Sequence, residues 1–176
     1  MVAQESPGEW VLLQYRLPRE PSTPRSAVWR RLRALGVAQL GDGLVALPHD
    51  ARTREQLDWV AAEVREASGT AALWLARPAT AAQEAELART MARARAEEYR
   101  AVRDEALAGL QRTGGAGAAS LPPAEHARLV KRLRAELRRV RRRDFSAPPE
   151  RAEAVAAVEE LARAAAAAPV AAGRHP

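Results

Sequence analysis

The first part of the chain alternates short apolar runs with segments of helical periodicity. The apolar runs at residues 10–17 (WVLLQYRL) and 70–76 (TAALWLA) are rich in strand-forming side chains. Two further runs, VAQL (37–40) and LVALP (44–48), flank the Gly-Asp-Gly sequence at 41–43. Apolar runs on both sides of a glycine-rich turn predict a β-hairpin. The pattern therefore predicts four strands, the middle two joined by a tight turn.

Two amphipathic helices are predicted between these strands. Their apolar positions recur at helical spacing and are Val28, Leu32 and Leu35 in the first helix and Leu57, Val60, Ala61 and Val64 in the second. Thr23 is the expected N-cap of the first helix, with Pro24 in its first turn and Gly36 after its end. The second helix is expected to begin at Asp50 or Thr53, with Thr53 and Gln56 as a capping box.

The order strand–helix–strand–strand–helix–strand is typical of an α+β fold, the ferredoxin-like βαββαβ unit. We predict that this domain covers residues 9–78 and that a helical extension of about three helices covers residues 79–168. The extension is predicted to begin with a long helix at 79–112, whose moderate apolar face contains Leu87, Met91, Ala94 and Val102. A linker at 113–120, a basic helix at 122–143 and an alanine-rich helix to about residue 168 follow it. Residues 169–176 are predicted to form a flexible tail.

Positive charge is concentrated in one segment. The chain has a formal net charge of +6. Residues 128–143 (RLVKRLRAELRRVRRR) hold nine basic residues and a single acid, Glu136, so the rest of the chain is slightly acidic. A narrow apolar stripe runs through this basic helix and consists of Leu129, Leu133, Leu137 and Val140. The stripe is expected to dock on a neighbour while the basic side chains point outward.

So dense a basic face favours contact with a polyanion, above all with DNA phosphates. The predicted DNA-binding residues are Arg30, Arg31 and Arg33 of the first helix and Arg128, Lys131, Arg132, Arg134, Arg138, Arg139, Arg141, Arg142 and Arg143 of the basic helix. The alternative is a solvated face that pairs with acids of neighbouring helices, for example Glu97, Glu98 and Glu105. A membrane-surface helix is disfavoured because the stripe lacks Trp and Phe.

Several segments resemble a known family. The segments at residues 15–21 (YRLPREP) and 28–32 (VWRRL) carry most of the resemblance, and the hairpin and the TREQ sequence at 53–56 add to it. Together they resemble the N-terminal domain of the chromate-resistance regulator ChrB. The resemblance extends over roughly residues 9–163, because EYRAVRDEA and RRRDFSAPPERAEAVAAVEEL look like the helical extension of that family.

The resemblance implies a cytoplasmic, DNA-binding transcriptional regulator linked to chromate export. Its first domain is similar to the Cas2-like, ferredoxin-fold unit of phenylacetate-pathway repressors. Full-length ChrB proteins carry a second, C-terminal domain of similar size, which this sequence lacks. If chromate is sensed by that domain, we expect this chain to bind DNA or a partner without sensing chromate itself.

No catalytic, cofactor or metal-binding pattern is found in the sequence. Cas2-like nucleases place an acidic metal ligand at the end of the first strand, where this chain has Leu-Gln-Tyr-Arg at 13–16. An arginine at that point disfavours two-metal cleavage. The chain has no cysteine, and His49, His126 and His175 lack any partner at metal-ligand spacing. We therefore expect no enzyme activity, no cofactor and no metal.

An oxyanion site is the one small-ligand site that the sequence suggests. Arg16, Arg19 and Arg25 flank the junction between the first strand and the first helix. Guanidinium groups bind tetrahedral oxyanions such as chromate in a bidentate manner. The same three side chains could also hold a DNA phosphate or pair with Glu9 and Glu20.

The expected partners are DNA, chromate or another oxyanion, and a second copy of the chain, because ferredoxin-like sheets have open edges. The start of the chain has no signal-peptide pattern and no run is long enough to span a bilayer, so a cytoplasmic location without membrane contact is expected. The four tryptophans are expected in the core. The competing interpretation is a non-enzymatic protein–protein interaction module whose basic helix docks on an acidic partner.

Overall fold

The computed structural model describes residues 8–113 and 122–167. Its elements, in chain order, are β1 (Trp10–Arg16), α1 (Ser22–Leu35), β2 (Ala38–Gly41), β3 (Leu44–Pro48), α2 (Ala51–Glu66), β4 (Thr70–Ala76), α3 (Ala81–Thr113), α4 (Pro123–Arg141) and α5 (Glu150–Ala167). Most of the predicted linker, the predicted tail and His175 lie outside the described residues.

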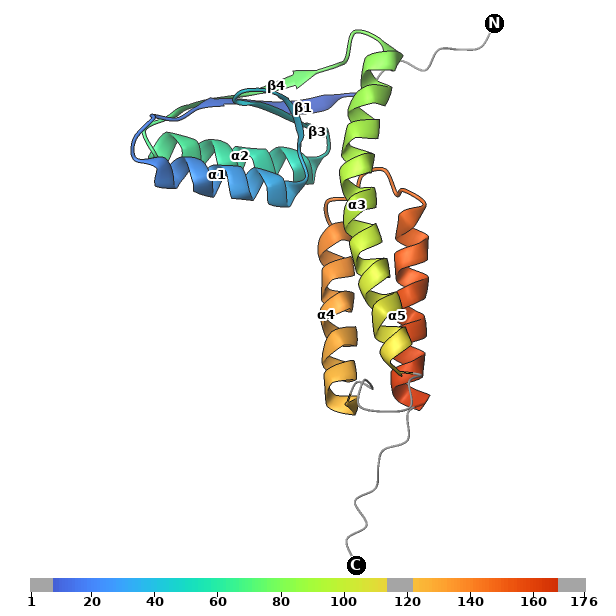
Figure 1. Cartoon of the computed structure of the whole chain (residues 1–176). Coiled ribbons are helices and arrows are strands. Elements are labelled where there is room, and N and C mark those ends of the chain that lie inside the picture. The colour runs from blue at the N-terminus through green and yellow to red at the C-terminus, as the bar shows by residue number, and fades with distance from the viewer. Residues whose placement is uncertain (1–7, 114–121, 168–176) are drawn as a thin grey trace, which may run out of the picture. The chain divides into compact units, whose positions relative to one another are not determined.

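The four strands form one antiparallel sheet in the order β2-β3-β1-β4. Helices α1 and α2 lie on the same face of this sheet (Figure 1). The α+β fold, with a ferredoxin-like unit followed by helices, is therefore confirmed.

The first core lies between the sheet and these two helices. Alternate residues of β1, Val11 and Leu13, are buried there beside Val45 and Leu47 of β3. Val28 and Leu32 of α1, and Leu57, Val60, Ala61 and Val64 of α2, meet them as predicted. The helical spacing thus identified the buried face of both helices correctly.

The first turns of α3 also join this core. Met91 is buried in it and Leu87 packs against it. Trp10 is 4% exposed, and its indole Nε1 donates to Glu84 Oε1 at 3.4 Å. Trp10 is the one tryptophan that fits the prediction of core packing. Trp29, Trp59 and Trp74 are 38%, 61% and 56% exposed, so the prediction is wrong for these three.

The helix starts show which capping signals operate. Helix α1 begins at Ser22, with Pro21 as N-cap and no side-chain cap, so the predicted cap by Thr23 is wrong. Gly36 ends α1 in the left-handed conformation, as predicted. Helix α2 begins after Asp50, whose carboxylate accepts from the Thr53 N–H while the Thr53 hydroxyl accepts from the Asp50 N–H. This reciprocal capping box fixes the start of α2, and because it joins Asp50 to Thr53, the predicted box of Thr53 with Gln56 is wrong.

The β2–β3 turn depends on one glycine. Gly43 has φ +71°, and a Cβ atom placed on it would lie 2.3 Å from the carbonyl oxygen of Tyr15. The Gly43 carbonyl accepts from the Tyr15 N–H at 2.7 Å. The hairpin turn can therefore lie against the end of β1 only because this residue has no side chain.

The second core is formed by three helices. It contains Tyr99, Val102 and Ala106 of α3 together with residues of α4 and α5, namely Leu129, Val130, Leu133, Leu137, Val140, Ala154, Ala157, Val158 and Leu161. The helices approach closely at Gly109, where a Cβ atom would lie 2.8 Å from Leu129 Cδ2 and 3.0 Å from Leu161 Cδ1. The small residue lets larger side chains of α4 and α5 fill the centre.

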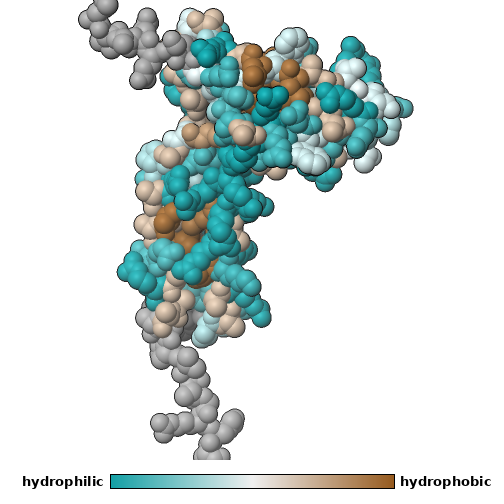
Figure 2. All heavy atoms as spheres, turned by 180° about the vertical axis from the view of Figure 1, so that it is seen from behind, coloured by the Kyte–Doolittle hydropathy of each residue, from teal (hydrophilic) through white to brown (hydrophobic). Residues whose placement is uncertain are grey.

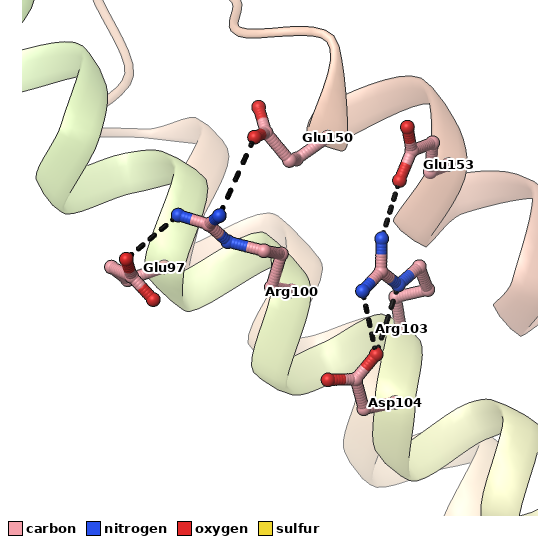
Figure 3. Close-up of polar contacts among 6 residues, drawn as sticks. All are labelled: Glu97, Arg100, Arg103, Asp104, Glu150 and Glu153. Atoms are coloured by element: carbon pink, nitrogen blue, oxygen red, sulfur yellow. Dashed lines mark hydrogen bonds and ion pairs between the residues drawn. The ribbon is translucent and has the colours of Figure 1, made fainter.

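Arginines of α3 tie α3 to α5 at the surface of this core (Figure 3). Arg103 donates to Glu153 at 2.6 Å and to Asp104 at 2.9 Å. These hydrogen bonds, that to Glu153 first, raise the pKa of Arg103 above its ordinary value. Arg100 contacts Glu97 at 2.7 Å and Glu150 at 4.0 Å.

The chain divides into two compact units, and the division falls inside α3. One unit contains the sheet, α1, α2, α3 up to Ala92, and Arg143–Ser146. The other contains α3 from Arg93, α4 and α5. Across the described ranges, no helix is both long and apolar enough to cross a membrane.

The capping box generates a pH-dependent prediction. Asp50→Ala is expected to lower the free energy of unfolding by about 1 kcal/mol at neutral pH, because the Thr53 N–H loses its acceptor. The backbone hydrogen bond from Thr53 holds the pKa of Asp50 below its ordinary value of 3.8. The stabilising effect should therefore be complete above that value and should disappear as the pH falls through the lowered pKa. Urea unfolding at several pH values measures this difference.

Asp50→Asn is the control, since it keeps a capping acceptor that does not titrate. A difference between the wild-type protein and Asp50→Ala that persists unchanged in strong acid would contradict the assignment.

Candidate nucleic-acid interface

Helix α4 presents two distinct faces. Its buried face contains the predicted stripe of Leu129, Leu133, Leu137 and Val140, and also His126 and Val130. Every other residue from Ala127 to Arg142 is exposed except Glu136, which is half-buried. Because the helix must turn its apolar stripe inward, the cations are left on the outward half of the cylinder.

Three cations on this face pair with acids. Arg132 donates to both carboxylate oxygens of Glu105 on α3, with one bond at 3.1 Å. Arg134 contacts Glu159 on α5 at 2.9 Å. Arg139 bonds Glu136 one turn earlier on α4 itself. The first two lie at the flanks of α4, where a neighbouring helix brings a carboxylate within reach.

These hydrogen bonds keep two of the arginines firmly charged. The bond to Glu105 raises the pKa of Arg132, and the bond to Glu136 raises the pKa of Arg139. All six side chains of these pairs remain accessible to solvent, so each pair contributes little to stability. Their main effect is to neutralise positive charge locally.

Of the three acids of α3 that were named as partners of the basic helix, Glu105 forms a hydrogen-bonded ion pair with it, and the charge of Glu98 contributes to the raised pKa of Arg139. Glu97 pairs with Arg100 and Glu98 with Arg95, both within α3. Glu159 was not foreseen. No local sequence pattern could have revealed it, because the contact depends on how α5 lies beside α4.

A second set of cations forms no such pairs. Among the described residues, no acid forms an ion pair with Arg128, Lys131, Arg138 or Arg141. The first three lie at i, i+3 and i+10, in the middle of the outward face, and Arg141 lies toward its α5 side. At 1.5 Å per residue, the set spans about 20 Å along the helix. We call these four residues the exposed row.

Small residues lie beside the exposed row. Lys131, Arg134 and Arg138 line a shallow depression whose other walls are Ala127, Val130, Ala162, Ala165 and Ala166. The alanines of α5 leave space beside the cations, so a bulky anionic group can approach them without steric conflict.

The remaining predicted DNA-binding residues lie at other places. Arg142 is the C-cap of α4, and Arg143 belongs to the sheet-bearing unit. On α1, Arg31 pairs with Glu63 of α2, and Arg30 Nε donates to the Ser26 carbonyl at 3.3 Å. Arg33 is exposed in the last turn of α1. The two predicted groups of cations therefore belong to different units, and α1 offers a sparser set than α4.

Two of the three predicted oxyanion-binding residues share one hollow. Arg16 and Arg25 both line a depression of about 1090 Å³ at the end of the sheet, together with Gln14, Thr70 and the β2–β3 turn. Arg25 Nη2 donates to the Pro18 carbonyl at 2.8 Å, which positions its guanidinium group. Arg19 is exposed but does not line this hollow. Asp42 lines it as well and brings one negative charge.

The same hollow includes the end of β1, where Gln14 and Arg16 lie and where the strand has no acidic residue. Tyr15 lies between them, and burial raises the pKa of its hydroxyl. Within residues 8–113 and 122–167, no group of three or more His, Asp or Glu side chains is arranged to hold a metal. His49 contacts Glu9 at 3.1 Å, and His126 is buried in the second core.

The comparison with known families agrees with the resemblance found in the sequence. A family model described as Protein ChrB, N-terminal, matches residues 25–169, which is most of the chain. The chain belongs to the ChrB N-terminal family. It is thus a ChrB-type protein associated with chromate resistance. The match begins inside α1 and includes every later element through α5 and the whole exposed row, whereas the YRLPREP segment precedes it.

No curated protein and no solved structure matches the chain. For this member of the ChrB N-terminal family, assignments of individual residues therefore rest on the contacts described above.

Free energies of unfolding can test the division of the α4 cations into a paired set and the exposed row. Replacing Arg134 and Glu159 singly and together by alanine should give a coupling energy of about 0.2–1 kcal/mol that decreases at high salt. Arg138→Ala should change the free energy of unfolding by much less, since it breaks no ion pair. Chemical denaturation at low and high salt measures both. A larger loss from Arg138→Ala than from Arg134→Ala would contradict this division.

Proposed function

We propose that this chain is a DNA-binding transcriptional regulator of the ChrB type, and that the exposed row of α4 contacts DNA phosphates. The observation that supports the proposal is the contrast on α4 between cations that form ion pairs and cations that do not. Arg132, Arg134 and Arg139 form ion pairs, whereas Arg128, Lys131, Arg138 and Arg141 form none with the described acids and lie along about 20 Å of one helix face. Such a row matches the requirement of a polyanion with regularly spaced charges.

Electrostatics explains why this arrangement would bind DNA. Each phosphate neutralised by Lys or Arg releases condensed counterions, and that release drives association. Four unpaired cations provide this gain without first breaking an internal ion pair. The paired cations Arg132, Arg134 and Arg139 would have to leave Glu105, Glu159 and Glu136 before they could contribute fully.

Phosphate contacts of this kind supply affinity and orientation, but they do not read sequence. The proposal therefore assigns the exposed row to positioning on DNA. It assigns no catalytic step to the chain, and it includes a cytoplasmic location, where the chain would meet DNA. The competing proposal is an interaction module whose exposed row docks on an acidic protein.

The decisive experiment uses two charge-matched triple variants. One replaces Arg128, Lys131 and Arg138 of the exposed row by glutamine, and the other replaces the paired Arg132, Arg134 and Arg139. Both lose three charges, so any difference between them reports direct contact. Binding to the promoter region and to scrambled DNA is measured by fluorescence anisotropy over a range of salt concentrations.

The exposed-row variant is expected to lose about three units of the salt slope, since each phosphate contact contributes about 0.9. Its thermal stability should stay close to that of the wild-type protein. The paired-set variant should lose less of the slope and more stability. Equal loss of slope in both variants would contradict direct contact by the exposed row. Absence of DNA binding by the wild-type protein would overturn the proposal in favour of the interaction module.

We also propose that the hollow at the end of the sheet holds a tetrahedral oxyanion such as chromate. The observation in favour is that Arg16 and Arg25, nine positions apart in the sequence, line the same depression. The Thr70 side chain adds a hydroxyl donor there. Two guanidinium groups can bind a dianion with parallel charge-assisted hydrogen bonds.

Arg16→Gln and Arg25→Gln should each weaken chromate binding about tenfold or more, because a charge-assisted hydrogen bond contributes about 1.5–3 kcal/mol. Arg19→Gln is the matched control, since Arg19 lies in the same segment but outside the hollow. Isothermal titration calorimetry with chromate and with sulfate measures the affinities. Equal weakening by Arg19→Gln, or no binding of either anion by the wild-type protein, would overturn this site.

A further inference from the structure

The two edges of the sheet differ in a way that bears on association. The β2 edge is four residues long, and its pairing with β3 shifts register between Gln39 and Gly41. The β4 edge is seven residues long and pairs with β1 in unbroken register from Thr70 to Ala76. Proteins protect open edges with short strands, bulges, charges or proline. The β2 edge has two of these protections and β4 has none.

The side chains of β4 are also unusual for an edge that faces water. The strand reads TAALWLA and contains no charged residue. Trp74 is 56% exposed on the face away from α1 and α2, and Leu75 is 50% exposed on the opposite face. Hydrophobic side chains also reach the surface of the sheet-bearing unit in Figure 2. Large apolar groups on both faces of one edge are a liability unless something covers them.

One hydrogen bond shows which backbone groups of β4 point outward. Arg65 Nη2 on α2 donates to the Ala71 carbonyl at 3.0 Å. Ala71 lies opposite Tyr15, whose N–H donates to the Gly43 carbonyl on the β3 side, so the backbone groups of Ala71 do not pair with β1 and point outward. Alternation along a strand then turns the N–H and C=O groups of Leu73 and Leu75 outward as well. A carbonyl oxygen can accept two hydrogen bonds, so the Arg65 contact does not prevent pairing.

We propose that β4 pairs with β4 of a second copy of this chain in antiparallel orientation, joining two four-stranded sheets into one. An uncharged strand can meet an identical strand without juxtaposing like charges, which a two-fold contact requires. The pairing satisfies the outward backbone groups of both strands and covers part of Trp74 and Leu75.

The flank of α2 supports a second copy as the occupant. Arg65 lies on the flank of α2 that faces the β4 edge, as its bond to Ala71 shows. Asp58 is exposed seven residues earlier, on the same side of the helix. A two-fold axis that pairs β4 with β4 places the two α2 helices side by side and antiparallel. Asp58 of each copy then lies toward Arg65 of the other, which gives two reciprocal ion pairs.

The first test measures mass and uses the opposite sheet edge as a matched control. In analytical ultracentrifugation the wild-type chain should sediment at twice its mass of 19.1 kDa. Leu75→Lys should shift it to the monomer, because a charge on the edge disfavours pairing. Leu40→Lys introduces the same charge at the β2 edge, where Leu40 is 39% exposed, and should leave the dimer intact. A wild-type monomer, or a dimer disrupted by Leu40→Lys and not by Leu75→Lys, overturns the proposal.

A second test uses the absence of cysteine from the chain. Trp74→Cys provides a single thiol near the proposed two-fold axis and should form a covalent dimer rapidly with a short bis-maleimide, whereas Leu40→Cys should not.

Charge reversal adds a specific test of α2. Asp58→Arg and Arg65→Asp should each weaken the dimer, and the double variant should restore it, because the reciprocal pairs are re-formed with their signs exchanged. Failure of the double variant to restore the dimer overturns the placement of α2.

Discussion

Burial of the apolar stripe of α4 against α3 and α5 is the constraint on which the charged surface of the helical unit depends. The stripe fixes the rotation of α4 about its own axis, and Gly109 of α3 lets Leu129 and Leu161 close in on one another. Once that rotation is fixed, the position of each basic residue in the sequence determines which way its side chain points from α4. The two flanks of α4 face carboxylates of the neighbouring helices, whereas in residues 8–113 and 122–167 no carboxylate forms an ion pair with the exposed row.

In the sheet-bearing unit too, close packing determines where charged side chains lie, but there the backbone conformation of one turn decides their position. The β2–β3 turn lies against the carbonyl of Tyr15 because Gly43 has no side chain. That contact places the turn beside the end of β1, and Arg25 is held nearby through the Pro18 carbonyl. The hollow that contains Arg16 and Arg25 is thus a result of how the backbone packs at the end of the sheet.

The sequence was sufficient where the determining interactions are local. Alternation of apolar residues, the glycine-rich turn and the polar residues at the start of α2 lie within a few residues of the elements they define. Prediction failed where the outcome depended on distant partners. The stripe expected on α3 included Ala94, which is exposed, whereas Arg95 is 8% exposed and pairs with Glu98 at 3.1 Å. An arginine in a buried position cannot be inferred from hydropathy, because its burial depends on that pairing.

Lys131 is the only lysine in the chain, and it lies within the exposed row of α4. Guanidinium groups remain protonated over the whole pH range in which proteins fold, so the charge of this surface does not respond to pH. Acylation of side-chain amines can remove charge at Lys131 alone. The exposed row therefore carries a nearly permanent charge, and Lys131 is the one position where acylation can reduce it.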